Sequence, residues 1–271
     1  MVSNLLETDV EDILESAFTG TEGELLVVDP SDETIESIVE AGVDRTDLPE
    51  ILMLADEDVL KDVMDDFLVA SKAADLIDDG SLTIRELPED ADNSLFVSED
   101  RVLALVSTDD RVAALSSEDE EFVDEVFSTY HEAFDEAEDH RLRTPAISHV
   151  RETMGEEIGE EARADFDSVL DSMETARGNG DGLDEVTISL LVAAKNDALL
   201  YDISKWGEDV GIASKATFSR TKTRLEDLGL IDTEKVPIDV GRPRLRLKLG
   251  DERLKDTSPD QLASAAESML A

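Results

Sequence analysis

DISKWGEDVGIASKATFSR, the run of residues 202–220, predicts two short helices joined by a tight turn. Asp202 is a suitable N-cap for the first helix, because its carboxylate can accept a hydrogen bond from an unpaired backbone amide. Gly207 lies where the second helix would have to approach closely, and Gly211 is expected to end the first helix with a positive φ. Ser214 is a suitable N-cap for the second helix. This pattern is typical of a helix-turn-helix.

The second helix is expected to have an apolar inner face and a small, hydroxylated and basic outer face. Phe218, Leu225 and Leu228, together with Thr221 or the stem of Lys222, have the spacing of the inner face. The outer face is suited to a DNA major groove, where short side chains allow close approach and Arg or Lys can donate to bases. The candidate DNA-binding residues in the two helices are Ser204, Lys205, Ser214, Lys215, Ala216, Thr217, Ser219, Arg220, Thr223 and Arg224.

The residues after this motif predict the β-hairpin of a winged helix. A first strand begins near Leu230, the tip reads VGRPR at residues 240–244, and the return strand alternates cations with leucines up to Leu249. A period of two places the leucines on one face and the cations on the other. Arg242 in the stiff Gly-Arg-Pro turn, and Arg244 beside it, are candidate contacts to phosphate or to a minor groove.

Basic residues are concentrated in this part of the chain. The 271 residues carry a net charge of −45, and residues 1–183 contain 11 Lys and Arg against 53 Asp and Glu. Residues 214–249 reverse that balance, with nine basic residues against five acidic ones. A solvated helix and hairpin in an ordinary small domain would also fit the pattern, but the local positive charge favours a nucleic-acid partner.

The overall composition indicates a folded protein adapted to molar salt. Apolar residues make up 41% of the chain and recur in periodic runs, which disfavours disorder despite the charge. A dense carboxylate surface keeps a protein hydrated at high salt, so we expect a salt-loving archaeal source. The absence of Cys excludes disulfides and thiolate metal sites. Without a recognisable signal peptide or a long apolar run, the chain is expected in the cytoplasm.

The N-terminal half predicts an α/β fold. Residues 4–18 and 56–78 have the spacing of amphipathic helices, and short apolar runs at 24–29 and 50–54 are typical of buried parallel strands. Short strands within 82–115 are expected to finish the sheet as an antiparallel edge. The expected domains are a mixed α/β, sensor-like effector-binding domain at 1–140, a helical linker at 141–182, a winged helix-turn-helix at 183–250 and a C-terminal helix at 251–271.

Two segments are candidates for the interface of a homodimer. Phe122, Val126, Tyr130 and Phe134 recur at every fourth position of a helix expected at 119–137, which could pack on the sheet or form a dimer seam. The C-terminal helix is the second candidate. A homodimer is expected because molar salt removes most of the affinity gained by counterion release, and one winged helix covers only half of a dyad operator.

A cluster of arginines is the candidate effector site. Arg141, Arg143 and Arg151 fall within eleven residues of a region that is otherwise poor in cations, and Thr144 could start a helix whose amides attract an anion. These arginines could equally pair with acids and hold the linker in place. The functional hypothesis is a phosphorylated sugar, because guanidinium groups bind phosphate through a planar fork. The candidate effector-binding residues are Arg101, Arg141, Arg143 and Thr144.

An enzyme is the main alternative class, and the sequence disfavours it. No glycine-rich phosphate-binding turn follows the apolar run at 24–29. His131, His140 and His149 lie nine residues apart, which is not a metal-ligand spacing. We therefore expect no catalytic residues, no metal and no cofactor.

Three runs resemble the haloarchaeal TbsP-type transcriptional regulators: LLYDISKWGED at 199–209, ASKATFSRTK at 213–222 and VGRPRLRL at 240–247. The resemblance is most specific over 185–250, and it implies a regulator of central carbon metabolism acting on genes of sugar breakdown and gluconeogenesis. A looser likeness is to TrmB-type sugar-sensing regulators, which place the winged helix first. The alternative is an effector-independent DNA-binding or architectural protein whose N-terminal domain serves only dimerisation.

Overall fold

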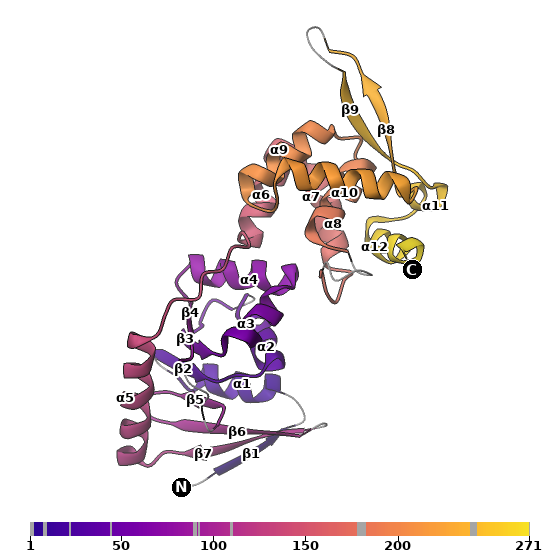
Figure 1. Ribbon diagram of the computed structural model, residues 1–271. Helices are drawn as coiled ribbons and strands as arrows, with labels where there is room; N and C mark the ends of the chain where they lie inside the picture. The colour runs from indigo at the N-terminus through magenta and orange to yellow at the C-terminus, as the bar shows by residue number, and fades with distance from the viewer. Residues whose placement is uncertain are drawn as a thin grey trace. The chain divides into compact units, whose positions relative to one another are not determined.

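The computed structural model of the chain describes residues 3–7, 10–21, 23–43, 45–88, 91, 93–108, 111–177, 183–238 and 243–270. They form two compact units, which we call unit 1 (Met1–Asp65 and Lys72–Leu142) and unit 2 (Asp66–Ser71 and Arg143–Ala271). Figure 1 shows unit 1 as a sheet with helices and unit 2 as a helical unit with a hairpin. The predicted fold class, an α/β part followed by a winged helix-turn-helix, is confirmed.

The sheet of unit 1 combines parallel and antiparallel strands, as predicted. Among the described strands the order is β1-β7-β6-β5-β2-β3-β4. The last three strands of that order run parallel, and β5, β6, β7 and β1 are joined by antiparallel pairing. The bounds are β1 Ser3–Glu7, β2 Glu24–Val28, β3 Glu50–Ala55, β4 Leu82–Glu86, β5 Leu95–Val97, β6 Val102–Thr108 and β7 Arg111–Ser117.

The single helix predicted at residues 4–18 is wrong. The segment instead forms strand β1 and helix α1 (Val10–Thr19). The backbone of β1 pairs antiparallel with β7, from Ser3 opposite Ser116 to Glu7 opposite Val112. Pairing with a strand far along the chain has overridden the local helical periodicity.

Helices cover both faces of this sheet. Figure 1 shows α1, α2 (Asp32–Val43) and α3 (Glu57–Met64) on one face and α5 (Glu120–Glu136) on the other. Both ends of α5 pack on the sheet, because Val123 and Phe134 are buried in one cluster with apolar residues of β2, β3 and β5. The helix thus provides one wall of the cavity described below.

The helix predicted at 56–78 is divided into α3 and α4 (Phe67–Asp78). Asp56 is the N-cap of α3, and its carboxylate accepts hydrogen bonds from two backbone amides of the first turn. Asp66 repeats the arrangement for α4, because its Oδ1 accepts from the amide of Leu68 at 2.9 Å. A second capping carboxylate therefore starts a new helix.

Unit 2 is built around α8 (Glu185–Lys195). Every residue from Val186 to Ala194 is buried, so this helix is enclosed on all sides. Residues 141–182, expected as a linker, contain α6 (Ile147–Glu157) and α7 (Glu160–Leu170), which share one core with α8. Although α8 is apolar it is short, and no described helix is both long and apolar enough to cross a membrane.

The C-terminal helix packs on its own chain. α12 (Pro259–Leu270) follows the short α11 (Glu252–Lys255) and lies against α7. It buries Leu262, Ala263 and Ala266 there. The apolar side of this helix, which the sequence made a candidate dimer contact, is therefore covered within the chain.

Candidate nucleic-acid interface

The helix-turn-helix consists of α9 (Leu200–Val210) and α10 (Lys215–Asp227). Trp206 and Phe218, one from each helix, are fully buried. A Cβ atom added to Gly207 would lie only 2.3 Å from the ring of Phe218. The predicted need for glycine at this crossing is therefore confirmed, because any side chain would separate the two helices.

The turn between the helices has the predicted local geometry. Gly211 ends α9 in the left-handed conformation with φ 95°. The hydroxyl oxygen of Ser214 accepts a hydrogen bond from the amide of Thr217 at 3.2 Å, so Ser214 is the N-cap of α10. The left-handed conformation of Gly211 and the side-chain cap of Ser214 therefore fix where α10 begins and the direction in which it leaves the turn.

Ser214→Ala should lower the free energy of unfolding by about 1 kcal/mol, because the first turn of α10 loses its cap. Urea unfolding in molar KCl measures the change. Ser168→Ala is the matched control, because the half-exposed Ser168 in α7 donates, among the described residues, only to the carbonyl oxygen of Ala164 in its own helix. Equal stability of Ser214→Ala and the parent would show that the cap is dispensable.

The predicted N-cap of the first helix is wrong. α9 begins at Leu200, and Leu199 occupies the N-cap position without a side-chain hydrogen bond. Asp202 lies in the first turn, where its carboxylate pairs with Arg244 of the hairpin at 3.2 Å. A carboxylate is favourable both at the N-cap and in the first turn of a helix. The sequence alone therefore could not distinguish these two positions for Asp202.

One face of α10 is exposed and carries the predicted small, hydroxylated and basic residues. Phe218, Lys222 and Leu225 point inward and are buried. Leu228, predicted to lie inside, is 43% exposed, because it follows the last helical residue as C-cap. The exposed residues of this face are Ala216, Ser219, Arg220, Thr223 and Arg224.

The other lysines of the motif are held by carboxylates. Lys215 pairs with Glu208, and Lys205 pairs with Asp209 and, at 3.5 Å, with Glu157. The hydrogen bond from Lys215 lowers the pKa of Glu208 and raises the pKa of Lys215. The hydrogen bond between Lys205 and Asp209 likewise raises the pKa of Lys205 and lowers the pKa of Asp209. These lysines reach DNA only if phosphate replaces a carboxylate.

Arg220 and Arg224 differ from these lysines. Neither forms an ion pair with any described residue, although the chain contains 69 acidic side chains. The guanidinium of Arg220 donates only to the hydroxyl of Thr217, at 3.3 Å. Because they are four residues apart, both guanidinium groups lie on one side of α10.

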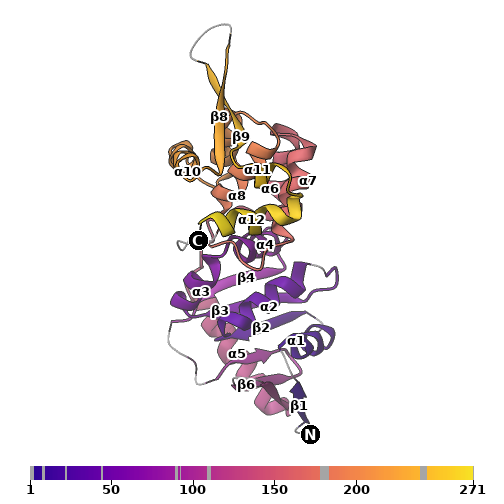
Figure 2. The same cartoon turned by 90° about the vertical axis from the view of Figure 1, so that its right-hand side faces the viewer.

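The hairpin is a wing of two described strands, β8 (Ile231–Val236) and β9 (Arg244–Leu249). Figures 1 and 2 show it projecting from the helices of unit 2. Leu247 and Leu249 are buried, as the alternation predicts. Arg244 lies 3.9 Å above the ring of Tyr201, so it is held against α9. Arg242 at the tip lies outside the described residues.

Ser204, also a candidate for DNA contact, lies inside the unit. It is 7% exposed, and its hydroxyl donates to the carbonyl oxygen of Tyr201 at 3.2 Å. The side chain therefore serves the packing of α9. Lys205, the next residue, is half-exposed and pairs with Asp209 and Glu157.

The arginines expected at an effector site are distributed over different places. Arg101 donates to the carbonyl oxygen of Ser16 in α1 at 2.8 Å, whereas Arg141 lines an open cavity of about 490 Å³. Arg143 and Thr144 belong to unit 2. The predicted helix start at Thr144 is wrong, because α6 begins at Ile147 after a residue that makes no side-chain cap.

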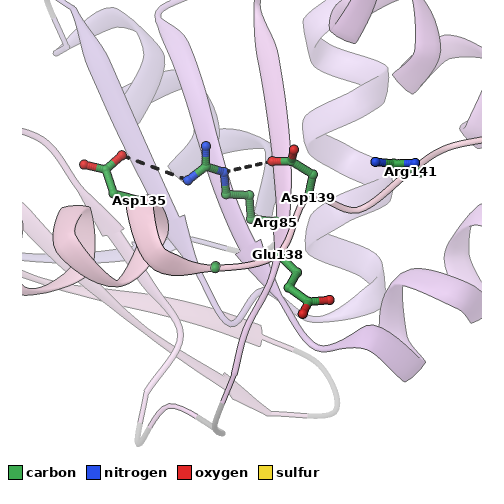
Figure 3. A pocket seen from close by; sticks show the side chains of 6 residues that line it. Arg85, Asp135, Glu138, Asp139 and Arg141 are labelled. Carbon is green, nitrogen blue, oxygen red and sulfur yellow. Dashed lines mark ion pairs between the residues drawn. The ribbon is translucent and has the colours of Figure 1, made fainter.

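The cavity beside Arg141 contains a residue that the sequence analysis missed. Arg85 of β4 forms ion pairs with Asp139 at 3.2 Å and with Asp135 at 4.0 Å (Figure 3). Its guanidinium also donates to the carbonyl oxygen of Phe134. Arg141 forms no ion pair with any described residue. Besides the two arginines, the cavity is lined by Asp135, Ala137, Glu138 and Asp139.

Two family models together match residues 2–267. The model "Transcriptional regulator TbsP-like, N-terminal" matches residues 2–145. The model "Transcriptional regulator TbsP-like, C-terminal HTH domain" matches residues 146–267. A comparison with curated proteins gives no match.

Two solved structures align with about half of the chain. The archaeal chromatin protein TrmBL2, whose structure is described as showing a novel mode of DNA binding, is 18% identical, with a TM-score of 0.38 over 51% of this chain and 54% of TrmBL2. Nuc, a phospholipase D family member from Salmonella typhimurium, is 9% identical, with a TM-score of 0.38 over 52% of this chain and 99% of Nuc. The chain spans about half the length of TrmBL2.

The family models cover nearly the whole chain, and both describe regulators, not enzymes. The resemblance carried by the helix-turn-helix and wing residues is confirmed, and the C-terminal match contains α9, α10 and the wing. The chain belongs to the TbsP-like family of transcriptional regulators and carries a DNA-binding helix-turn-helix domain.

Proposed function

We propose that the protein is a sequence-specific regulator that reads its operator with the exposed face of α10. The observation that carries this proposal is the pair Arg220 and Arg224, which form no ion pair with a described carboxylate in a chain of net charge −45. An arginine can donate two hydrogen bonds to guanine in the major groove. The other residues that we assign to DNA contact are Lys205, Ser214, Lys215, Ala216, Thr217, Ser219 and Thr223, with Arg242 and Arg244 from the wing.

High salt makes base contacts more important than phosphate contacts here. The gain from counterion release nearly vanishes in molar salt, so a regulator in the cytoplasm of a salt-loving archaeon depends on contacts to base edges and on a homodimer. Nuclease footprinting of the full chain on genomic DNA in molar KCl tests this reading. Protection confined to discrete dyad sites supports the proposal, and continuous protection without preferred sites supports an architectural protein.

The target genes that we propose are those of sugar breakdown and gluconeogenesis. This assignment rests on the resemblance to TbsP-type regulators. The effector that we propose is a phosphorylated sugar. The cavity beside Arg141 supports this class, because it is lined by partners for the phosphate and for the sugar hydroxyls. Arg141 is free to bind phosphate, and the carboxylates of Asp135, Glu138 and Asp139 can accept hydrogen bonds from sugar hydroxyls.

The position of the cavity gives a route from effector to DNA along the chain. Asp135 belongs to α5, the last helix of unit 1, and Glu138, Asp139 and Arg141 follow directly after it. A ligand held by these residues shifts residues 135–141 from one conformational state to another only if the ligand binds the two states with different affinities. The residues that follow lead into α6 of unit 2.

Arg141→Ala should weaken the binding of a sugar phosphate by about 1.5–3 kcal/mol, because one charge-assisted hydrogen-bonding partner is removed. Isothermal titration of the full chain in molar KCl with triose and hexose phosphates, and with the neutral sugars, measures the effect. Arg143→Ala is the matched control, since Arg143 is also an exposed arginine without a described ion-pair partner. Equal affinities for parent and Arg141→Ala would place the effector elsewhere.

A further inference from the structure

α5 covers only part of the sheet face on which it lies. It contacts β2, β3 and β5, and it leaves the outer part of β6 and β7 open. Cross-strand partners share a face, so Leu115 beside Ala104 and Val106 beside Ala113 lie on this open side. Val106 is 51% exposed and Leu115 is 47% exposed. Phe122, in the first turn of α5, is 48% exposed next to them.

This concentration is unusual for the chain. Only seven large hydrophobic side chains are exposed among the described residues, and three of the seven are Val106, Leu115 and Phe122. The other four are scattered over different elements. We call the open surface formed by Ala104, Val106, Ala113, Leu115 and Phe122 the open sheet face. Contiguous exposed apolar surface of this kind is typical of an interaction site.

A groove beside the open sheet face lies between α5 and the strands. Its volume is about 410 Å³, and all the residues that line it are uncharged, although 34% of the chain is charged. A small molecule would fill the groove and still leave Val106 exposed, because Val106 is not part of its lining. An extended protein surface would cover both. The principal lining residues are Leu95, Val102, Ala104, Leu115, Phe122 and Tyr130.

We propose that the open sheet face is covered by the same face of a second copy of this chain. The face is self-complementary in chemistry, because it carries both an exposed aromatic side chain, Phe122, and the uncharged groove that Phe122 helps to line. A two-fold axis would place Phe122 of each copy in the groove of the other, as in an isologous contact. An apolar, uncharged face needs an uncharged partner surface. In a chain of net charge −45 the open sheet face of a second copy provides such a surface. The inference rests on the proposed function to the extent that a dyad operator requires two winged helices.

Charge at the rim of this contact makes the dimer depend on salt. Glu118, Glu120 and Glu121 precede or flank Phe122 and are exposed. In the dimer these carboxylates from both copies would approach each other. The screening length for exposed charges is about 3 Å in molar salt and about 30 Å in roughly 0.01 M salt, so these carboxylates repel each other strongly only at low salt. The dimer is therefore stable in molar KCl and dissociates on dilution of the salt.

Leu115→Asp tests the contact directly. A carboxylate in the centre of the interface raises the dimer dissociation constant by about 30-fold or more, the effect of losing a central contact residue. Val43→Asp is the matched control, because Val43 is an exposed valine at the end of α2, away from β6 and β7. Sedimentation equilibrium in molar KCl should give dimers for the parent and the control. A monomeric parent, or a Leu115→Asp chain that dimerises as tightly as the parent, overturns the inference.

Crosslinking provides a test that does not depend on how Leu115→Asp folds. The chain contains no Cys, so single cysteines can be introduced without background. Mixing the Leu115→Cys and Phe122→Cys chains under oxidation should give a covalent dimer, whereas Val43→Cys should not. No dimer above the Val43→Cys level contradicts the inference. A monomer that still binds its operator specifically refutes this inference alone, and a dimer without specific DNA binding refutes the proposed function alone.

Discussion

Arg220→Ala should weaken binding to the specific operator by about 1–3 kcal/mol and leave the fold intact. Arg220 lies on the exposed face of α10, and it forms no ion pair with a described residue. Its guanidinium is therefore available for the base edge of guanine without first breaking a contact to a carboxylate. Lys215, which must leave Glu208, should contribute less.

The experiment compares fluorescence anisotropy titrations on operator and on scrambled DNA in molar KCl. Arg253→Ala is the matched control, because Arg253 is an exposed arginine of α11 that pairs with Asp251 at 3.0 Å. We expect Arg220→Ala to lose affinity for the operator alone and Arg253→Ala to bind both as the parent does. An equal loss on scrambled DNA would mean that Arg220 contacts phosphate only.

Gly207→Ala should lower the free energy of unfolding by about 1–3 kcal/mol, because overpacking a well-packed crossing forces the backbone apart. The added Cβ would lie 2.3 Å from the ring of Phe218, which is fully buried and has no room to move. α10 would also shift relative to α9, so operator affinity should fall together with stability.

Gly155→Ala is the matched control, because Gly155 is also a helical glycine. Its added Cβ would meet the carboxylate of Glu160 at 3.0 Å, and that exposed side chain can move away. Replacing glycine by alanine inside a helix then stabilises by about 0.5–1 kcal/mol. Urea unfolding of the three proteins in molar KCl measures both effects. If Gly207→Ala were as stable as Gly155→Ala, close contact of α9 and α10 would not be required.

The helix-turn-helix could be predicted from sequence because its signals are local. Gly207, Gly211 and Ser214 each satisfy a requirement set by residues within one or two turns of helix. The errors arose where distant parts of the chain decide the outcome. β1 forms because β7 offers a pairing partner, and Asp202 turns to Arg244 in the wing.

The cavity that we propose for an effector could be predicted only in part. The unusual density of arginines at 141–151 predicted Arg141 as a candidate effector-binding residue, and Arg141 does line the cavity. Arg85 carried no local signal, because it meets Phe134 and Asp135 only after β4 and α5 have packed together. Arg101, the candidate expected from the nearby sheet edge, donates instead to the carbonyl oxygen of Ser16 in α1 and does not line this cavity.

The central claim is that α10 reads a specific DNA sequence. Selection of bound fragments from a random DNA pool with the full chain in molar KCl tests it most directly. We predict one enriched motif, arranged as two half-sites about one helical turn or a multiple of it apart, and weaker enrichment of that motif with Arg220→Ala. Bound DNA with no enriched motif, for the parent as for the variant, would contradict sequence-specific recognition.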